Sequence, residues 1–320
     1  MLKSILFTLV IIVSLFGCQK NNNLENEISK TKISFQFIEF HKEFFNASPS
    51  SLLDLKSNYP YLFPSSIPDS IWLQKIKKSD EQLLYQFVDS IFPNLIEEKK
   101  EITDLYKHVK YYKPSFKAPK TITLINNIDY ENSIIYADSL AFISLDIYLG
   151  QTCEVYNSFP SYLSRNFTKE RITVDLADKI IDQQFNISRN RSFLESMVYF
   201  GKRLYLKSIL LPKKEFYLIQ GVSKDKQKWA DENESQVWKY FISNELLFST
   251  DKSLNKRFID KAPFSKFYFE SDKETPGSIG TFIGYKIVLS FMQNNDVHLN
   301  DLLTLDAQTI LSKSKYKPLK

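Results

Sequence analysis

The sequence predicts an α+β protein: a mostly helical single domain with a small β-sheet. Of its 320 residues 43% are hydrophobic, and 26 Phe and 18 Tyr supply large side chains for a dense core without a disulfide. Apolar residues recur every three or four positions over most of the chain, which indicates amphipathic helices. Short β-rich runs are concentrated between Pro119 and Gly150. No period of 20–50 residues recurs, so a repeat architecture is excluded.

The first third of the chain is expected to be mostly helical. Ile33, Phe35 and Phe37 alternate with polar residues, which indicates a short strand ahead of the first helix. Pro93 and Pro114 are expected to follow the ends of two helices, because proline cannot continue a helix. Helical spacing of apolar residues occurs within four stretches, residues 40–45, 69–76, 80–91 and 96–109.

The predicted sheet follows, and the rest of the chain is again helical. The expected strands are residues 121–125, 133–136 and 140–149. Ser192 followed three residues later by Glu195 is typical of a capping box at the start of a helix. The clearest later helices are residues 168–184, 192–211, 232–248 and 275–294.

The N-terminus is typical of an exported lipoprotein. A basic start is followed by the apolar run 5–13 and by Leu15-Phe16-Gly17-Cys18, which resembles a bacterial lipobox. We expect residues 1–17 to be a lipoprotein signal peptide and Cys18 to carry a fatty acyl chain such as palmitate. An uncleaved anchor, or an ordinary signal with a chance cysteine, is the alternative.

The expected mature chain has two parts: a flexible tether, residues 18–30, and a single globular α+β domain, residues 31–320. The tether is polar and rich in Asn, which favours flexibility. No acidic run follows Cys18, which favours a periplasm-facing position on the membrane. Cys153 then has no disulfide partner and is expected to be a buried free thiol.

Charge and motif content exclude several functions. The formal net charge is only +5, and the few Arg residues do not cluster, so nucleic acid is not an expected partner. His41, His108 and His298 are too far apart in sequence to form the paired zinc ligands of one helix. A Gly-rich phosphate loop and a Gly-x-Ser-x-Gly motif are also absent from the sequence. We therefore predict no catalytic residue, no metal ligand and no cofactor.

One local pattern suggests close packing. Gly280 and Gly284 share a helix face with Gly277 and Pro276 just ahead, and small residues at this spacing let another backbone approach. The alternative is a surface that contacts a ligand or partner. We group these glycines with the two tryptophans of the same half of the chain as a candidate packing or partner surface: Gly277, Gly280, Gly284, Trp229 and Trp238.

Several segments together resemble one family. Leu145–Gly150, Tyr199–Tyr205, Pro276–Gly284 and Ser314–Pro318, in this order and behind a lipobox, are similar to the gliding motility lipoprotein GldB family. The resemblance implies a cell-envelope lipoprotein required for gliding, coupled to an outer-membrane protein secretion apparatus, with no known catalytic activity.

The resemblance also implies a distant likeness to zincin-type metallopeptidases. Phe200 stands where the second zincin motif would have Glu, and no His occurs between Val109 and Val297. The implied fold is therefore a degenerate zincin-like scaffold that lacks the metal site.

These observations favour a non-enzymatic envelope component. Its expected partners are the membrane, through the N-terminal lipid, and proteins of the motility or secretion machinery, reached through an aromatic-rich body. Two alternatives stay open: a metal-dependent peptidase with unconventional ligands, and a periplasmic module that binds a small ligand in a pocket. Sequence alone leaves the membrane leaflet, the oligomeric state and the partner's identity open.

Overall fold

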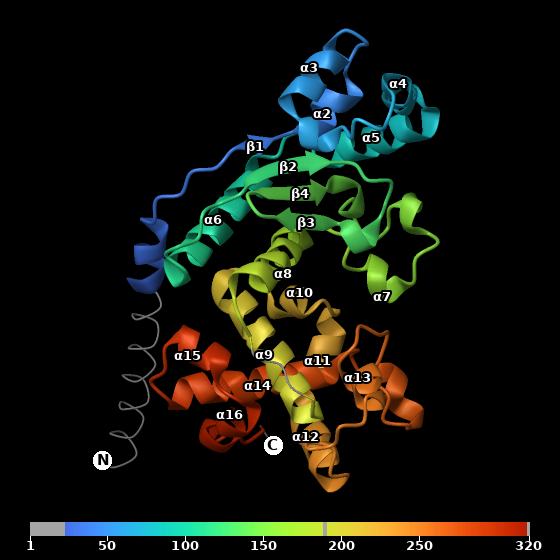
Figure 1. Ribbon diagram of the computed structural model, residues 1–320. Helices are drawn as coiled ribbons and strands as arrows, with labels where there is room; N and C mark the ends of the chain where they lie inside the picture. Colours follow the sequence, from blue (N-terminus) through green and yellow to red (C-terminus); the bar gives the residue numbers. More distant parts are fainter. Residues whose placement is uncertain (1–22, 188–190, 319–320) are drawn as a thin grey trace, which may run out of the picture.

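A computed structural model describes residues 23–187 and 191–318, and it confirms a mostly helical α+β protein with one small sheet (Figure 1). In Figure 1 the sheet and the helices of the first half of the chain form the upper part, and the helices of the second half form the lower part. The predicted signal peptide and Cys18 lie outside the described residues.

The sheet has four strands in the order β1-β2-β4-β3. The first three in this order run parallel, and β3 pairs antiparallel with β4 at the edge. Thr121, Ile122 and Thr123 are all buried, because central strand β2 is covered on both faces. The strand bounds are β1 Phe37–Ile38, β2 Lys120–Leu124, β3 Ile134–Ala137 and β4 Leu140–Ser144.

Two predicted strands are shorter in the structure. Of the first one, expected over residues 33–37, only Phe37 pairs with β2, together with Ile38 just after it. The run expected to extend to Leu149 leaves the sheet after Ser144 and forms a turn of 3₁₀ helix. Asp146 in this turn is fully buried, and its carboxylate accepts hydrogen bonds from the backbone N–H groups of residues 126 and 128. These hydrogen bonds stabilise the turn against a continued strand.

Helices of the first half pack around the sheet. Helices α2 to α5 lie near β1 and β2, and α8 lies near β3 (Figure 1). Their bounds are α2 Phe40–Phe45, α3 Ser51–Asn58, α4 Asp69–Lys77, α5 Ser79–Ile91, α6 Ile96–Tyr112, α7 Ser161–Ser164 and α8 Ile172–Gln184.

The second half of the described chain is helical. The capping box predicted at Ser192 and Glu195 is confirmed at the start of α9. The helix expected over residues 232–248 is the shorter helix α12, which begins at Glu234 and ends at Ser243; a separate helix, α11, precedes it. The bounds are α9 Phe193–Leu210, α10 Phe216–Gln220, α11 Lys224–Glu232, α12 Glu234–Ser243, α13 Ser253–Phe258, α14 Ile279–Asn294, α15 Leu299–Thr304 and α16 Ala307–Ser314.

Two hydrophobic cores share helix α9. The first core lies between the sheet and its helices and receives Leu206 and Leu210 from the end of α9. The second lies among α9 and the later helices and receives Leu194 and Met197 from the start of α9. Burial of both ends of one helix couples the two cores, because neither end can leave its core without exposing apolar surface.

Residues 23–29, expected to be part of a flexible tether, are helical and packed on the body instead. Ile28 is 1% exposed, and Glu25 contacts buried His108 on α6 with 3.2 Å between Oε1 and Nε2. The Nζ group of Lys107 donates to the carbonyl of Ser29. The polar composition favours flexibility, but these polar contacts hold the segment on α6, and Ile28 is buried in the folded body. Among the described residues, no helix is both long and apolar enough to cross a membrane.

Candidate functional site: an aromatic cavity

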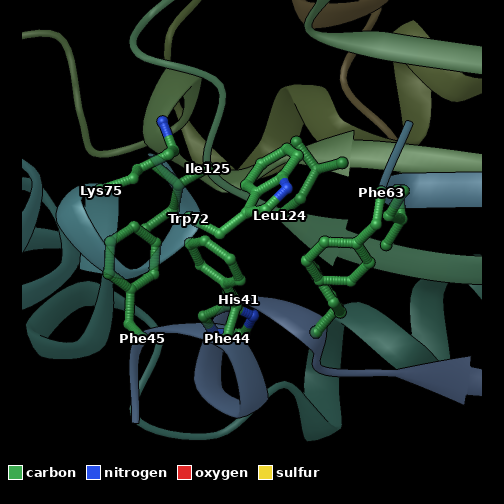
Figure 2. Close-up of a pocket in the computed structure, with 10 residues that line it drawn as sticks. His41, Phe44, Phe45, Phe63, Trp72, Lys75, Leu124 and Ile125 are labelled. Atoms are coloured by element: carbon green, nitrogen blue, oxygen red, sulfur yellow. The ribbon is translucent and has the colours of Figure 1, made fainter. Parts of the chain in front are cut away.

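A cavity of about 140 Å³ lies between α2, α4 and the end of β2 (Figure 2). It is lined almost wholly by aromatic and aliphatic side chains, with one histidine and one lysine among them: Phe40, His41, Phe44, Phe45, Leu62, Phe63, Trp72, Lys75, Leu124 and Ile125. A cavity of about 150 Å³ is large enough to bind benzene, so this one can hold a single six-membered ring.

The aromatic walls come from three short segments. Phe40 and Phe44 lie one turn apart on α2 and stack with their ring centroids 5.7 Å apart. Phe63 follows the 3₁₀ turn Pro60–Leu62 and meets Trp72 of α4 edge to face at 5.1 Å. Figure 2 shows the rings of Phe44, Phe63 and Trp72 grouped around the cavity. These contacts position the walls before any ligand enters.

His41 is the one histidine in this apolar lining. Its side chain is buried, and Nδ1 lies 2.8 Å from Oγ1 of Thr123 on β2. The Thr123 hydroxyl donates to the carbonyl of Ile38, so it accepts from Nδ1–H of His41. Burial lowers the pKa of His41 to about 4, which keeps the ring neutral at neutral pH. Its Nε2 atom is then a free acceptor, with no hydrogen-bond partner among the described residues.

Trp72 of α4 lines the same cavity. Its Nε1–H is buried and also lacks a hydrogen-bond partner within the described chain. Lys75, one turn further along α4, lies at the edge of the cavity, and in Figure 2 its amine points away from the rings. This amine is 3.0 Å from the carboxylate of Glu81. The unpartnered polar atoms of His41 and Trp72 are therefore one acceptor and one donor.

No sequence pattern predicted this cavity. The spacing of Phe40, Phe44 and Phe45 indicated a packed helix face, but His41 looked like an ordinary histidine. Thr123 lies 82 positions away in the sequence, and only the fold brings it to His41. The one available signal was a histidine set among phenylalanines on a helix next to a predicted strand.

The predicted glycine group lies inside the protein. A Cβ atom on Gly284 would come 1.8 Å from the carbonyl oxygen of Met197, and one on Gly277 would come 2.0 Å from that of Ala262. A Cβ on Gly280 would meet the carbonyl oxygen of Phe258 at 2.9 Å. These positions therefore accommodate close backbone approach.

The other candidate residues are dispersed. Trp229 and Trp238 are partly buried against the second core, and Trp238 meets Tyr316 edge to face at 5.3 Å. Cys153 is a free, half-buried cysteine, which is less buried than expected. His298 is exposed. In the part of the chain that the structure describes, no three His, Cys, Asp or Glu side chains form a potential metal site.

A second polar cluster joins α8 to α9. Asp178 contacts Lys207 at 3.0 Å and Arg203 at 3.2 Å, and Lys207 also donates to the carbonyl of Ile219. Burial opposes ionisation of Asp178, but the charges of Lys207 and Arg203 outweigh it and lower its pKa to about 2. Each charge has an opposite partner, which is typical of a structural ion-pair network.

The described fold and cavity define an α+β protein with a preformed aromatic cavity. The family model described as gliding motility protein GldB matches residues 21–318, so the chain belongs to this family. This match confirms the resemblance found in the sequence. No curated protein and no solved structure matches the chain. The zincin-like scaffold that the resemblance implied therefore finds no support.

Proposed function

We propose that the protein is a lipid-anchored, non-enzymatic component of the cell envelope that gliding motility requires. Membership of the GldB family implies involvement in gliding motility, and the match over residues 21–318 is the observation that carries the proposal. The lipobox-like Leu15-Phe16-Gly17-Cys18 supports a lipid on Cys18. The anchor holds the folded body against the periplasmic side of a membrane, where it contacts a protein of the motility or secretion machinery.

Lipidation and motility test the anchor together. A strain that lacks the protein is complemented with the wild type, with Cys18→Ala, and with Cys153→Ala as the matched control. Labelled palmitate is expected in the wild type and in Cys153→Ala but not in Cys18→Ala, and only the first two should restore gliding. Membrane-bound Cys18→Ala protein together with normal gliding would contradict the proposal.

Affinity capture tests the partner. The mature protein, cross-linked in gliding cells, is expected to retain a motility or secretion protein of the envelope. Recovery of no envelope protein, combined with undisturbed gliding in the deletion strain, would refute this part of the proposal.

A small-ligand binding module is the second candidate, and the aromatic cavity favours it. Pockets that are mostly apolar with a few polar groups are typical of ligand sites. The third alternative, a metal-dependent peptidase, is separated from both by elemental analysis of the purified protein. Stoichiometric zinc would favour the peptidase.

A further inference from the structure

We propose that one basic face of the protein rests on the membrane that holds the lipid anchor and binds the anionic phospholipid headgroups there. This inference rests on the anchor at Cys18 in the proposed function, and it adds which side of the folded body meets the bilayer. The basic face consists of exposed Tyr111 and of five lysines around the second half of α6: Lys30, Lys32, Lys107, Lys110 and Lys117.

The second half of α6 carries positive charge without carboxylates. From residue 105 to residue 128 the chain has five lysines and no Asp or Glu. The carboxylates of α6 come earlier, where Glu101 and Asp104 pair with Lys214 and Lys213. Within the described chain, no lysine of the basic face forms an ion pair. The positive charge of this face is therefore not neutralised by the protein itself.

Backbone carbonyls hold two of the five amines in place. The Nζ group of Lys107 donates to the carbonyl of Ser29 at 2.9 Å. The Nζ group of Lys110 donates to the carbonyls of Pro114 and Phe116. A carbonyl has no net charge, and an ammonium group has three donors. Both lysines thus keep their positive charge and at least one donor for a headgroup phosphate.

The other three lysines are exposed, and aromatic contacts keep their segments beside α6. The ring of Tyr106 on α6 lies 4.9 Å from that of Phe35 and 5.7 Å from that of Phe116. Lys32 is three residues before the first of these rings, and Lys117 directly follows the second. The chain therefore brings lysines from two distant segments to the same half of α6.

Tyr111 gives the basic face an amphipathic side chain. It lies on the same side of α6 as Lys107 and Lys110, because residues three and four apart are neighbours on a helix. Its side chain is 37% exposed. Tyrosine is enriched where a protein meets the boundary between a membrane and water, because its ring is apolar and its hydroxyl is polar.

The short chain between the anchor and the body favours a membrane as the occupant of this face. Residue 23, where the described chain begins, is five residues after Cys18, and five extended residues span at most about 18 Å. Figure 1 shows the segment that begins there beside α6, where Glu25 contacts His108. A lipid on Cys18 would hold this part of the body near the bilayer, and the basic face has the charge opposite to that of anionic headgroups.

Vesicle binding tests the proposal. The mature chain, residues 18–320, is made without its signal peptide, so that it carries no acyl chain. It is mixed with vesicles of phosphatidylcholine, or of phosphatidylcholine with phosphatidylglycerol. We expect it to co-sediment with the vesicles that contain phosphatidylglycerol and not with the neutral ones. Added salt should weaken this binding, because salt screens exposed charges.

A matched pair of triple variants assigns the binding to the basic face. A lysine close to an anionic membrane contributes about fivefold in affinity, so loss of three should weaken binding roughly a hundredfold. The test variant combines Lys30→Gln, Lys32→Gln and Lys117→Gln.

The control removes three exposed lysines around α13, which Figure 1 shows on the opposite side of the protein from residues 23–29. It combines Lys252→Gln, Lys256→Gln and Lys261→Gln. Charges farther from the bilayer than about 10 Å are largely screened at roughly 0.1 M salt, so the control should bind within about twofold of wild type. Circular dichroism checks that both variants are folded.

Cross-linking in cells separates a membrane from an acidic protein as the occupant. Lys117→p-benzoylphenylalanine is expected to cross-link to phospholipid on illumination, and the same substitution of Lys256 is not. A cross-link from position 117 to a protein, without phospholipid, would overturn the proposal. Equal binding to the two kinds of vesicle, no binding to either, or equal loss in the two triple variants would overturn it as well.

The anchor and the basic face fail separately in these tests. Labelled palmitate on Cys18 reports the anchor, whereas the vesicles report the basic face of a chain that has no acyl group. Palmitate labelling without vesicle binding would refute the basic face and leave the anchor. Vesicle binding without palmitate labelling would refute the anchor and still support the basic face.

Discussion

Gly284 of α14 lies directly against the carbonyl group of Met197 on α9, so close that a Cβ at position 284 would come 1.8 Å from the carbonyl oxygen. Gly201, one turn further along α9, faces Gly284 in turn, with 2.2 Å between its hypothetical Cβ and the carbonyl carbon of Gly284. The two helices therefore cross backbone to backbone. This crossing organises the second core, because α9 and α14 contribute many of its buried side chains.

Replacing Gly284 with alanine is expected to destabilise the fold. The added methyl group overlaps backbone, which cannot move aside as a side chain can, so the free energy of unfolding should fall by about 2–3 kcal/mol or more. Urea denaturation measures this change in the free energy of unfolding. Gln293→Ala, on the exposed face of the same helix, is the control and should stay within about 0.5 kcal/mol of wild type. An unchanged midpoint for Gly284→Ala would show that the crossing can relax.

The lowered pKa of buried Lys202 predicts that the folded state becomes more stable at alkaline pH. This lysine is 1% exposed, and its Nζ donates to the carbonyls of Leu303 and Leu305. Burial lowers its pKa to about 8, with nearby Asp306 opposing the shift. Between pH 8 and 10.5 the unfolded chain binds more protons at this group than the folded chain. Stability from this group therefore increases by about 2 kcal/mol from pH 7 to pH 10.

The measurement compares wild type with Lys202→Met by urea denaturation across pH 7 to 10. Methionine keeps much of the side-chain volume and removes the titration. The difference in unfolding free energy between the two proteins should change in favour of wild type as the pH rises. A difference that stays constant over this range would mean that Lys202 has an ordinary pKa.

The lowered pKa of Asp178 predicts that the folded state loses stability in acid. Its pKa is lowered to about 2, because the Lys207 and Arg203 charges outweigh the effect of burial. The ordinary pKa of this carboxyl group, 3.8, applies to the unfolded chain. Because the pKa is lower in the folded protein, the carboxylate stabilises the folded state at pH values above 3.8, and this contribution disappears as the pH falls toward 2. The carboxylate is 29% exposed. Solvent screening therefore limits the contribution to about 1–2 kcal/mol.

Asp178→Asn should accordingly be less stable than wild type at pH 7, with the gap narrowing between pH 4 and pH 2. Asp54→Asn, an exposed position on α3, is the control and should follow wild type throughout. Parallel pH profiles for Asp178→Asn and wild type would contradict the assignment.

Tyr316 is expected to hold the end of the described chain on α12. Its hydroxyl donates to Oε1 of buried Glu234 at 2.8 Å, and Lys286 contacts the other carboxylate oxygen at 3.1 Å. Tyr316→Phe removes one hydrogen-bond donor from the Glu234 carboxylate and should lower the free energy of unfolding by about 1–2 kcal/mol. Tyr130→Phe, whose hydroxyl is near exposed Glu131, serves as control. Equal unfolding midpoints for the two variants would show that the Tyr316 hydroxyl contributes nothing.

Local patterns predicted the elements but not their ends. The capping box at Ser192 determined where α9 begins, because the side chain and the backbone groups that it satisfies lie within one turn. The end of β4 depended on Asp146, whose partners are about 20 positions earlier, so no local pattern could indicate it. The packing of residues 23–29 similarly depended on α6, far along the chain.

For the candidate residues too, local patterns were visible in the sequence but contacts with distant segments were not. The spacing of the glycines near Gly284 correctly indicated a helix face for close approach, but the opposing Gly201 and Met197 could not be paired with it from sequence. His41 showed no local sign of a role, since its binding partner Thr123 and its neighbour Trp72 belong to other elements.

Composition, periodicity and short motifs were sufficient for the α+β class, the order of most elements and the family, because these depend on interactions between residues close in sequence or on segment identity. The two cores that share α9, the crossing at Gly284 and the cavity beside His41 arise only when distant segments pack. The reason is physical: burial, close backbone approach and an unpaired polar atom are properties of a place in space, and the chain brings its residues to that place only by folding.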